Sequence, residues 1–428
     1  MTVQEQRAEL TQHTLGNGLR VVVASDHSAP AVAVNIWYNV GSRHEEPGRT
    51  GLAHLFEHLM FQGSEHVASG EHFRLLQASG ASLNATTSFE RTNYFETIPA
   101  GALELSLWLE ADRMAGLLAA LDQANLDNQR DVVKNERRQR YDNQPYGTAW
   151  EHLYALTFPN GHPYHHMPIG SMADLDAATL DDAAAFFRRH YMPANAVLSI
   201  VGDIAADQAV RLAERYFARV PAATAPAQPA AVPLGPLAAP ARLVLAEQVP
   251  SPALYGIWRT PPDGTPAADA ADVATQILGG GSGSRLASRL IRRDELARGA
   301  YAGLSRFVRG DSTAMVVVRA RAGADIGAVQ AALDEELARL ADGGPTDEEM
   351  QRAIAMKERE WLDETADFGG QADQLSHFAS LFGDPGLAAT VTARLREVTP
   401  DQVREAAGLL RPEHAALVVY PGQDGEAA

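Results

Sequence analysis

The chain has 428 residues, too many for one ordinary hydrophobic core, so its length predicts two domains of about 200 residues each. A hydrophobic share of 46% and a charged share of 21% indicate a soluble globular protein. The net charge of -18 argues against nucleic-acid partners, which need basic stripes. Cysteine is absent, which excludes thiol catalysis, disulfides and cysteine-based zinc sites.

The N-terminal residues, MTVQEQR, contain no apolar signal core, and the chain has no apolar run of roughly 18 residues. We therefore expect no membrane partner. The simpler expectation for location is the cytoplasm, or the periplasm if a signal segment has been removed.

The first elements in chain order are two strands and a loop. Residues 14–24 predict a turn that runs into a β-branched strand, and residues 29–39 predict a second strand. The Gly- and Pro-containing stretch 41–48 is a predicted loop that leads to a helix, with Thr50 as its expected N-cap.

That helix, residues 51–61 (GLAHLFEHLMF), carries the main chemical motif. His54 and His58 lie one turn apart on one face, with Glu57 beside them. Two imidazoles at this spacing can bind one Zn²⁺, and a neighbouring carboxylate that is not a ligand can take a proton from water. The order H-x-x-E-H is typical of inverted zinc peptidases. The alternative interpretation is two partly exposed histidines on an amphipathic helix.

Elements after the motif alternate between helices and strands. A helix is predicted over 71–79, followed by a hairpin of 82–89 and 92–98 that turns near Glu90 and Arg91. The remaining predicted elements of this half are helices at 103–118, 122–141, 181–190 and 206–220, and a buried strand at 196–201.

An Ala- and Pro-dominated stretch, 221–241, is a predicted linker. It separates an N-terminal zinc-binding domain, 1–220, from a C-terminal domain, 242–428. The second half repeats the first in outline: residues 251–258 echo 28–37, and 411–419 echo 191–198. A helix at 267–278 takes the place of the metal helix but contains no histidine. The pattern predicts an α+β fold of two duplicated sheet-plus-helices domains, with a metal site in the first alone.

Two histidines leave a three-ligand zinc site one protein ligand short. Glu136, on the helix predicted over 122–141, is the candidate; the alternative for it is an exposed charge beside Arg137 and Arg138.

At this point the chain resembles the pitrilysin-type M16 metallopeptidases, the family that includes the mitochondrial processing peptidase. The resemblance rests on residues 51–63 (GLAHLFEHLMFQG), on residues 80–98 with their Asn-Ala-x-Thr strand, and on residues 195–203. Together with the duplicated layout, it covers nearly the whole chain and is most similar to the zinc-bearing subunits of the M16B type.

The resemblance implies that His54, His58 and Glu136 bind one zinc ion per chain and that Glu57 is the general base. The family often has a second glutamate seven residues before the ligand. Gln129 stands there in this chain, and it can hold a hydrogen bond but no charge, so we expect weaker support of the metal.

The resemblance also implies a zinc endopeptidase that hydrolyses short or unfolded peptides. In the family, one strand binds the substrate backbone as an added strand; here that strand would include Leu83, Asn84, Ala85 and Thr86. The alternative interpretation of these residues is an ordinary sheet edge.

Family peptidases further use an Arg and a Tyr seven residues apart to hold the substrate carbonyl. Here Arg293 and Arg292 precede Tyr301 by eight and nine residues. On a helix, a slip of one residue turns a side chain by about 100°. We therefore expect a second M16-like subunit to supply the pair in a heterodimer.

Two alternatives remain open. One is a self-sufficient homodimer that uses Arg292 or Arg293 with Tyr301. The other is a non-catalytic assembly subunit of the same fold; such subunits typically lose part of H-x-x-E-H, which is intact here.

Overall fold

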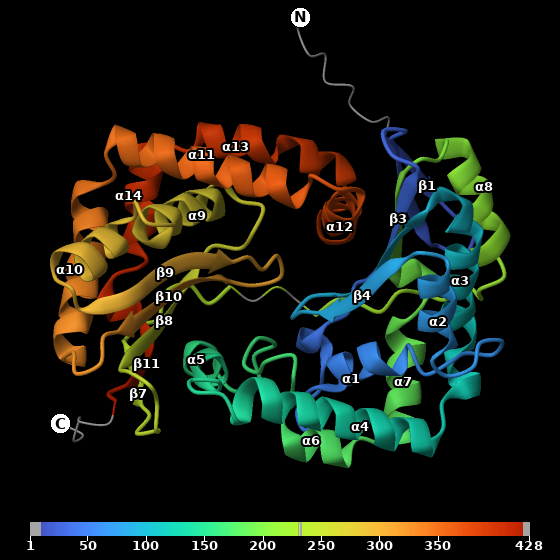
Figure 1. The fold of residues 1–428 in the computed structure, drawn as a ribbon, viewed down its shortest axis with the longest axis horizontal. Coiled ribbons are helices and arrows are strands. Elements are labelled where there is room, and N and C mark those ends of the chain that lie inside the picture. Colours follow the sequence, from blue (N-terminus) through green and yellow to red (C-terminus); the bar gives the residue numbers. More distant parts are fainter. Residues whose placement is uncertain (1–9, 230, 232, 423–428) are drawn as a thin grey trace, which may run out of the picture. The chain divides into compact units, whose positions relative to one another are not determined.

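The computed structural model describes residues 10–229, 231 and 233–422, and these form two compact units (Figure 1). The first unit takes its residues from Met1–Asn135, Pro168–Pro229 and Leu362–Ala389. The second takes its residues from Glu136–Met167, Ala230–Trp361 and Thr390–Ala428. These units do not follow the sequence-based division into two domains, 1–220 and 242–428, with a linker at 221–241. That division stays a prediction.

The first unit is built on a six-stranded mixed sheet, in the order β1-β2-β6-β3-β5-β4. Its strands are β1 (Leu10–Thr14), β2 (Arg20–Ser25), β3 (Ala31–Tyr38), β4 (Ser82–Thr87), β5 (Thr92–Pro99) and β6 (Ala196–Gly202). β2 and β6 are parallel, and all other neighbours are antiparallel. The hairpin of β4 and β5 therefore lies at one edge of the sheet, with β4 outermost.

Helices cover both faces of this sheet. The helices of the unit are α1 (Leu52–Leu59), α2 (Glu71–Ala78), α3 (Leu103–Ala120), α4 (Gln123–Arg137, except its last residues), α6 (Met172–Ala177), α7 (Leu180–His190), α8 (Ala206–Phe217) and α12 (Phe368–His377). α3 and α8 pack together on one face, whereas α12 packs on the other, against β3 and β6. Asn35 of β3 donates a hydrogen bond to Asp373 of α12 at 3.1 Å. β3 is consequently buried on both sides almost throughout its length.

The second unit contains a five-stranded sheet in the order β7-β11-β8-β10-β9. Its strands are β7 (Ala241–Val244), β8 (Ala253–Thr260), β9 (Ala297–Ser305), β10 (Ser312–Ala320) and β11 (Ala416–Tyr420). Its helices are α5 (Ala149–Thr157), α9 (Pro266–Gly279), α10 (Ile326–Gly343), α11 (Asp347–Glu364, except its last residues), α13 (Val391–Glu397) and α14 (Pro400–Gly408). Small and branched apolar residues of α9, α10 and α14 form the core against the sheet.

The two sheets share one topology. β7 and β11 are parallel, as β2 and β6 are, and the antiparallel series β11, β8, β10, β9 matches β6, β3, β5, β4. α9 follows β8 just as α1 follows β3. This agreement is what an internal duplication predicts. The predicted fold class, an α+β architecture with a sheet and helices in each half, is confirmed.

Each sheet receives one covering helix from the other half of the chain. α12 comes from the C-terminal half and packs on the first sheet, whereas α5 comes from the N-terminal half and packs on β8 and β11 of the second. This exchange explains why each compact unit collects several chain segments. Among the described residues, no helix combines the length and the apolar character that crossing a membrane requires.

Candidate metal centre

The helix that carries the motif, α1, is fixed by its apolar face and by its first turn. Leu55, Phe56 and Leu59 are fully buried, which leaves the histidine face half-buried. The helix starts at Gly51, whose φ of +88° favours glycine and whose Cβ, if present, would lie 2.8 Å from the carbonyl oxygen of Ile169.

The expectation that Thr50 caps this helix was wrong. Thr50 instead donates to Asp174 of α6, at 2.5 Å. The carboxylate of Glu45, in the preceding loop, accepts hydrogen bonds from the N–H groups of Gly51 and Ala53 at 2.9 and 2.7 Å. A carboxylate at a helix N-terminus satisfies donors that have no partner within the helix and is favoured by the helix dipole. The loop thus sets both the start and the direction of α1.

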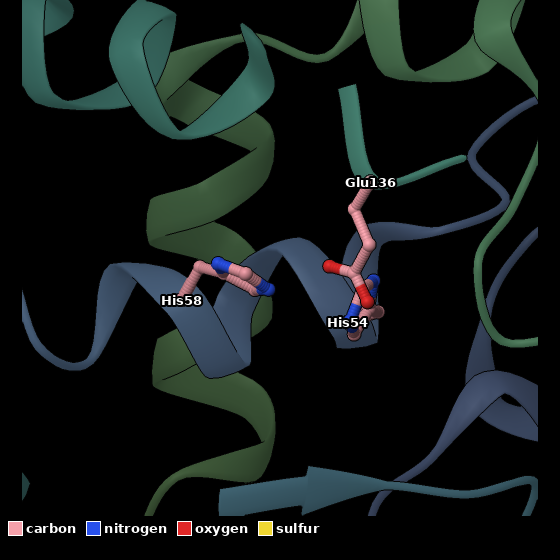
Figure 2. A group of neighbouring side chains, drawn as sticks. All are labelled: His54, His58 and Glu136. Carbon is pink, nitrogen blue, oxygen red and sulfur yellow. The ribbon is translucent and has the colours of Figure 1, made fainter. Parts of the chain in front are cut away.

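His54, His58 and Glu136 converge (Figure 2). One potential ligand atom of each lies within 4.8 Å of the others, and all three residues are half-buried. The two imidazole rings come from successive turns of α1, with centroids 4.9 Å apart, and the carboxylate comes from the last turn of α4.

α4 is held so that its last turn reaches α1. Leu126 and Val133 of α4 are fully buried. Arg130 donates to the carbonyl oxygen of Ala178 at 2.6 Å, and Lys134 forms an ion pair with Asp176 of α6. Glu136 itself forms an ion pair with Arg140, 2.8 Å away in the π-helical turn Arg138–Asp142 that follows.

The donor set fits zinc. Two imidazole nitrogens and one carboxylate oxygen are a ligand combination of catalytic zinc sites, which keep a fourth position open. Zinc bonds of about 2.1 Å in tetrahedral arrangement hold ligand atoms roughly 3.4 Å apart. The spread observed among the three residues, up to 4.8 Å, can close by side-chain rotation.

Glu57 lies beside the three and points to the sheet. Its Oε2 accepts a hydrogen bond from the hydroxyl of Thr87, on β4, at 2.6 Å. Arg91, at the turn of the β4–β5 hairpin, also interacts electrostatically with Glu57. Burial lowers the pKa of Arg91, and the carboxylates of Asp373 and Glu57 oppose that effect.

A pocket of about 230 Å³ opens next to Glu57 and His58. Its other lining residues come from α2, β4, α4 and the segment after α1: Phe61, Gln62, Phe73, Asn84, Ala85 and Gln129. Gln129 is buried. The predicted base, one predicted ligand and three further residues singled out from the sequence thus line one space, which is large enough for an apolar side chain.

The predicted substrate strand is the edge strand β4. Leu83, Asn84, Ala85 and Thr86 all lie on it, with Asn84 exposed and Ala85 buried. The carbonyl oxygen of Thr86 accepts a hydrogen bond from Arg91 at 2.9 Å. An edge strand is the geometry that peptide addition requires. Whether peptides bind there stays a prediction.

The expected helical relation between Arg292 or Arg293 and Tyr301 was wrong. Tyr301 lies on strand β9 with about half of its surface exposed, at 54%. The arginines end a short π-helical segment, Ala287–Arg293. Arg292 donates to Ser282 and Ser288, and Arg293 forms an ion pair with Asp294 at 3.0 Å. The spacing along a single helix therefore has no bearing on this pair.

Thr87 and Phe73 were not among the residues predicted to form the site. Thr87 follows the predicted substrate stretch directly. Strand alternation places it on the same face as Ala85, and that face is the one that meets α1. The alternation rule was therefore sufficient to identify it once β4 was assigned.

Comparisons with known proteins match both halves of the chain. Residues 20–166 match the family model described as Insulinase (Peptidase family M16), and residues 177–357 match the model described as Peptidase M16 inactive domain. His54, Glu57, His58 and Glu136 all fall within the first match.

Several relatives carry protease names. The chain is 30% identical over 377 residues to the zinc protease PqqE of Helicobacter pylori, covering 87% of this chain and 82% of that protein. It is also 30% identical over 219 residues to the mitochondrial-processing peptidase subunit beta of Lentinula edodes, covering 50% of this chain and 45% of that protein.

Solved structures agree with the fold. The crystal structure of a protease from Helicobacter pylori superposes with a TM-score of 0.90 at 25% identity, covering 97% of this chain and 99% of the other. The periplasmic protease PqqL of Escherichia coli gives a TM-score of 0.78 at 20% identity, covering 98% of this chain but 48% of PqqL.

Proposed function

This chain belongs to peptidase family M16, and from that premise we propose that it is a zinc-dependent endopeptidase of short or unfolded peptides. In this proposal His54, His58 and Glu136 hold one zinc ion, Glu57 is the general base, and β4 binds the substrate backbone. The observation that carries it is the convergence of the three ligand side chains (Figure 2), one of which, His58, lines a pocket together with Glu57.

The chemistry follows from these parts. Bound zinc supplies Lewis acidity, which lowers the pKa of a water to about 7 and polarises a carbonyl. Glu57 takes the proton of the attacking water and passes it to the leaving amine. Leu83, Asn84, Ala85 and Thr86 would align the peptide through backbone hydrogen bonds, so that recognition depends little on side chains. Gln129 would support the site without adding charge.

A non-catalytic assembly role is the alternative. The inactive-domain model matches residues 177–357, a stretch that contains none of the proposed ligands and not Glu57. Most of that match lies in the predicted C-terminal domain, which has no predicted metal site. An intact H-x-x-E-H motif with its third ligand in reach favours the enzyme.

We further propose a heterodimer in which a second M16-like subunit supplies an Arg/Tyr pair. Arg292 and Arg293 end a π-helical segment while Tyr301 lies on β9, and both arginine side chains already have partners within their own unit. One relative is named as a beta subunit, and this chain spans 48% of PqqL. A homodimer that uses Tyr301 is the rival. A cytoplasmic location stays a prediction, with the periplasm as the alternative.

Metal analysis tests the ligand set. We expect one zinc per chain in the purified protein and strong loss in the His58→Ala and Glu136→Gln variants. His13→Ala, on a half-buried histidine of β1 that lies outside the predicted ligand set, is the matched control and should keep its zinc. Full zinc occupancy in the two ligand variants would reject this set.

Peptide hydrolysis tests the base. Glu57→Gln should keep zinc and bind peptide but lose turnover by several orders of magnitude, because the amide cannot accept a proton. Glu71→Gln, on the surface of α2, should behave as the unaltered protein does. Substantial turnover by zinc-loaded Glu57→Gln would assign the base to another residue.

Reconstitution tests the partner. The chain alone should bind zinc and cleave peptides poorly, and activity should appear when a second M16-like subunit is added. Tyr301→Phe should then cost less than about tenfold in the assembled enzyme, roughly 1.4 kcal/mol of transition-state stabilisation. A fully active isolated chain that Tyr301→Phe inactivates would establish the homodimer instead.

A further inference from the structure

The hydroxyl of Thr87 is bonded to the proposed base. Thr87 Oγ1 lies 2.6 Å from Glu57 Oε2, within the range of about 2.5–2.7 Å for a hydroxyl that donates to a carboxylate. The two residues come from different elements, Thr87 from the last position of β4 and Glu57 from the last turn of α1. Both side chains are half-buried.

The sheet behind Thr87 sets the direction of this hydrogen bond. Thr92 faces Thr87 in the register of β4 and β5, and its hydroxyl donates to the carbonyl oxygen of Val40 at 2.9 Å. The two threonine oxygens are 3.4 Å apart, a long contact. Because the proton of Thr92 goes to Val40, the proton of Thr87 is available for Glu57.

A glutamate side chain has three rotatable bonds, so holding it in one conformation costs rotamer entropy. A general base acts only when its carboxylate lies within about 2.6–3.2 Å of the proton that it abstracts. An anchor at one oxygen orients the other.

We propose that Thr87 is a positioning residue: its hydroxyl holds Oε2 of Glu57 and thereby fixes the carboxylate in the conformation that takes the proton of the attacking water. This inference rests on the proposed function, since it assigns Glu57 as the base. It adds to that function a residue that contacts neither the metal ligands nor the peptide in the proposal. A purely structural Thr87 would affect stability but not turnover.

The test compares two substitutions at Thr87 in the active form of the enzyme, with its partner where the partner is needed. Thr87→Val keeps the shape but removes the donor, whereas Thr87→Ser keeps the donor. We expect Thr87→Val to lower kcat by about 10- to 100-fold, the range for losing one hydrogen bond to a charged group. KM and zinc content should change less than about twofold, and Thr87→Ser should retain kcat within about threefold.

A matched control is Thr275→Val. Thr275 is a buried threonine of α9 in the second unit whose hydroxyl donates to the carbonyl oxygen of Asp272 at 2.9 Å. It should lose some thermal stability and no kcat. A Thr87→Val enzyme with normal kcat, or a Thr87→Ser enzyme as impaired as Thr87→Val, would overturn the proposal.

A second readout needs neither zinc nor turnover. In the metal-free protein, Thr87→Val and Glu57→Ala should lower the melting temperature non-additively, because each removes the same hydrogen bond. Additive shifts would overturn the inference. Failure of the proposed function looks different: the zinc-loaded, unaltered enzyme would hydrolyse no peptide, or Glu57→Gln would remain active.

Discussion

Glu96 is a buried carboxyl group close to the site, and we predict that replacing it with Gln stabilises the protein. Glu96 of β5 and Glu110 and Arg113 of α3 are all buried, at 2%, 0% and 2% exposure. Arg113 bonds both oxygens of Glu110, one of them at 2.9 Å, whereas Glu96 accepts from the hydroxyl of Ser106. Burial raises the pKa of Glu96 well above its usual range, and the charge of Glu110 adds to this. Arg113 carries one positive charge and bonds Glu110, so it cannot balance a second negative charge on Glu96. We therefore expect Glu96 to be protonated.

The magnitude follows from linkage. In the unfolded chain Glu96 ionises near its ordinary pKa of 4.5. Above that pH, folding must take up a proton, and this costs about 1.4 kcal/mol for each pH unit until the pKa of the folded state is reached. Because the folded-state pKa is raised, the contribution to stability is complete below pH 4.5 and is lost as the pH rises. Gln at this position keeps the oxygen that Ser106 needs and takes up no proton.

Glu96→Gln should therefore stabilise the protein at neutral pH, and its advantage should grow by about 1.4 kcal/mol between pH 5 and pH 6. Urea denaturation of both proteins at pH 5, 6 and 7 measures this difference. Glu104→Gln, on the exposed part of α3, serves as the control and should show no such trend. A destabilised Glu96→Gln at pH 7, or an advantage independent of pH, would mean that Glu96 is ionised in the folded state.

Two further predictions concern buried charge elsewhere. Burial lowers the pKa of His44 to about 4 and that of His190 to about 3, whereas the unfolded side chains take up protons near pH 6.5. The stability of the folded protein should therefore fall as the pH drops from 6.5 towards 4, and it should fall less in His190→Gln. A denaturation midpoint that is equal at pH 7 and pH 5 would contradict this. In the second unit Arg306 lies 2.7–3.2 Å from Asp263, Asp269 and Asp272. Arg306→Met should therefore lower the free energy of unfolding, measured by urea denaturation, by about 3–5 kcal/mol. The control Arg293→Met, at the surface, should leave the midpoint unchanged, and equal effects of the two substitutions would refute the role of these carboxylates.

The metal helix could be predicted because local rules decide it. The apolar spacing of residues 52–60 determines which face is buried, and the i, i+4 spacing then places His54 and His58 together. The third position needed more than periodicity. α4 has a weak apolar pattern, and its approach to α1 depends on contacts with α6 far along the chain, such as Lys134 with Asp176.

Tertiary contacts decided what local rules did not. Glu45, six residues before Gly51, accepts the hydrogen bond at the start of α1. The N-cap preference considers only the adjacent position, which is Thr50 here. Tyr301 lies in a stretch of Ala and Gly with little strand preference, and β10 orders it by pairing. α5 and α12 each cover a face of a sheet that belongs mainly to the other half of the chain, and a prediction made segment by segment does not consider such contacts.

In the proposed mechanism, β4 both pairs with the peptide backbone and orients the general base Glu57. β4 is the edge strand of its sheet, so its outer backbone edge is where an added peptide strand would pair, whereas Ala85 and Thr87 lie on the face that meets α1. Residues i and i+2 of a strand share a face at a fixed rise of about 6.6–6.8 Å, so the register of a paired peptide and the orientation of Glu57 are set by the same backbone. A peptide that pairs with β4 would therefore meet the base at the same depth whatever its side chains are. Backbone pairing and base positioning on one strand would allow a peptidase to accept unrelated sequences without losing the alignment that proton transfer requires.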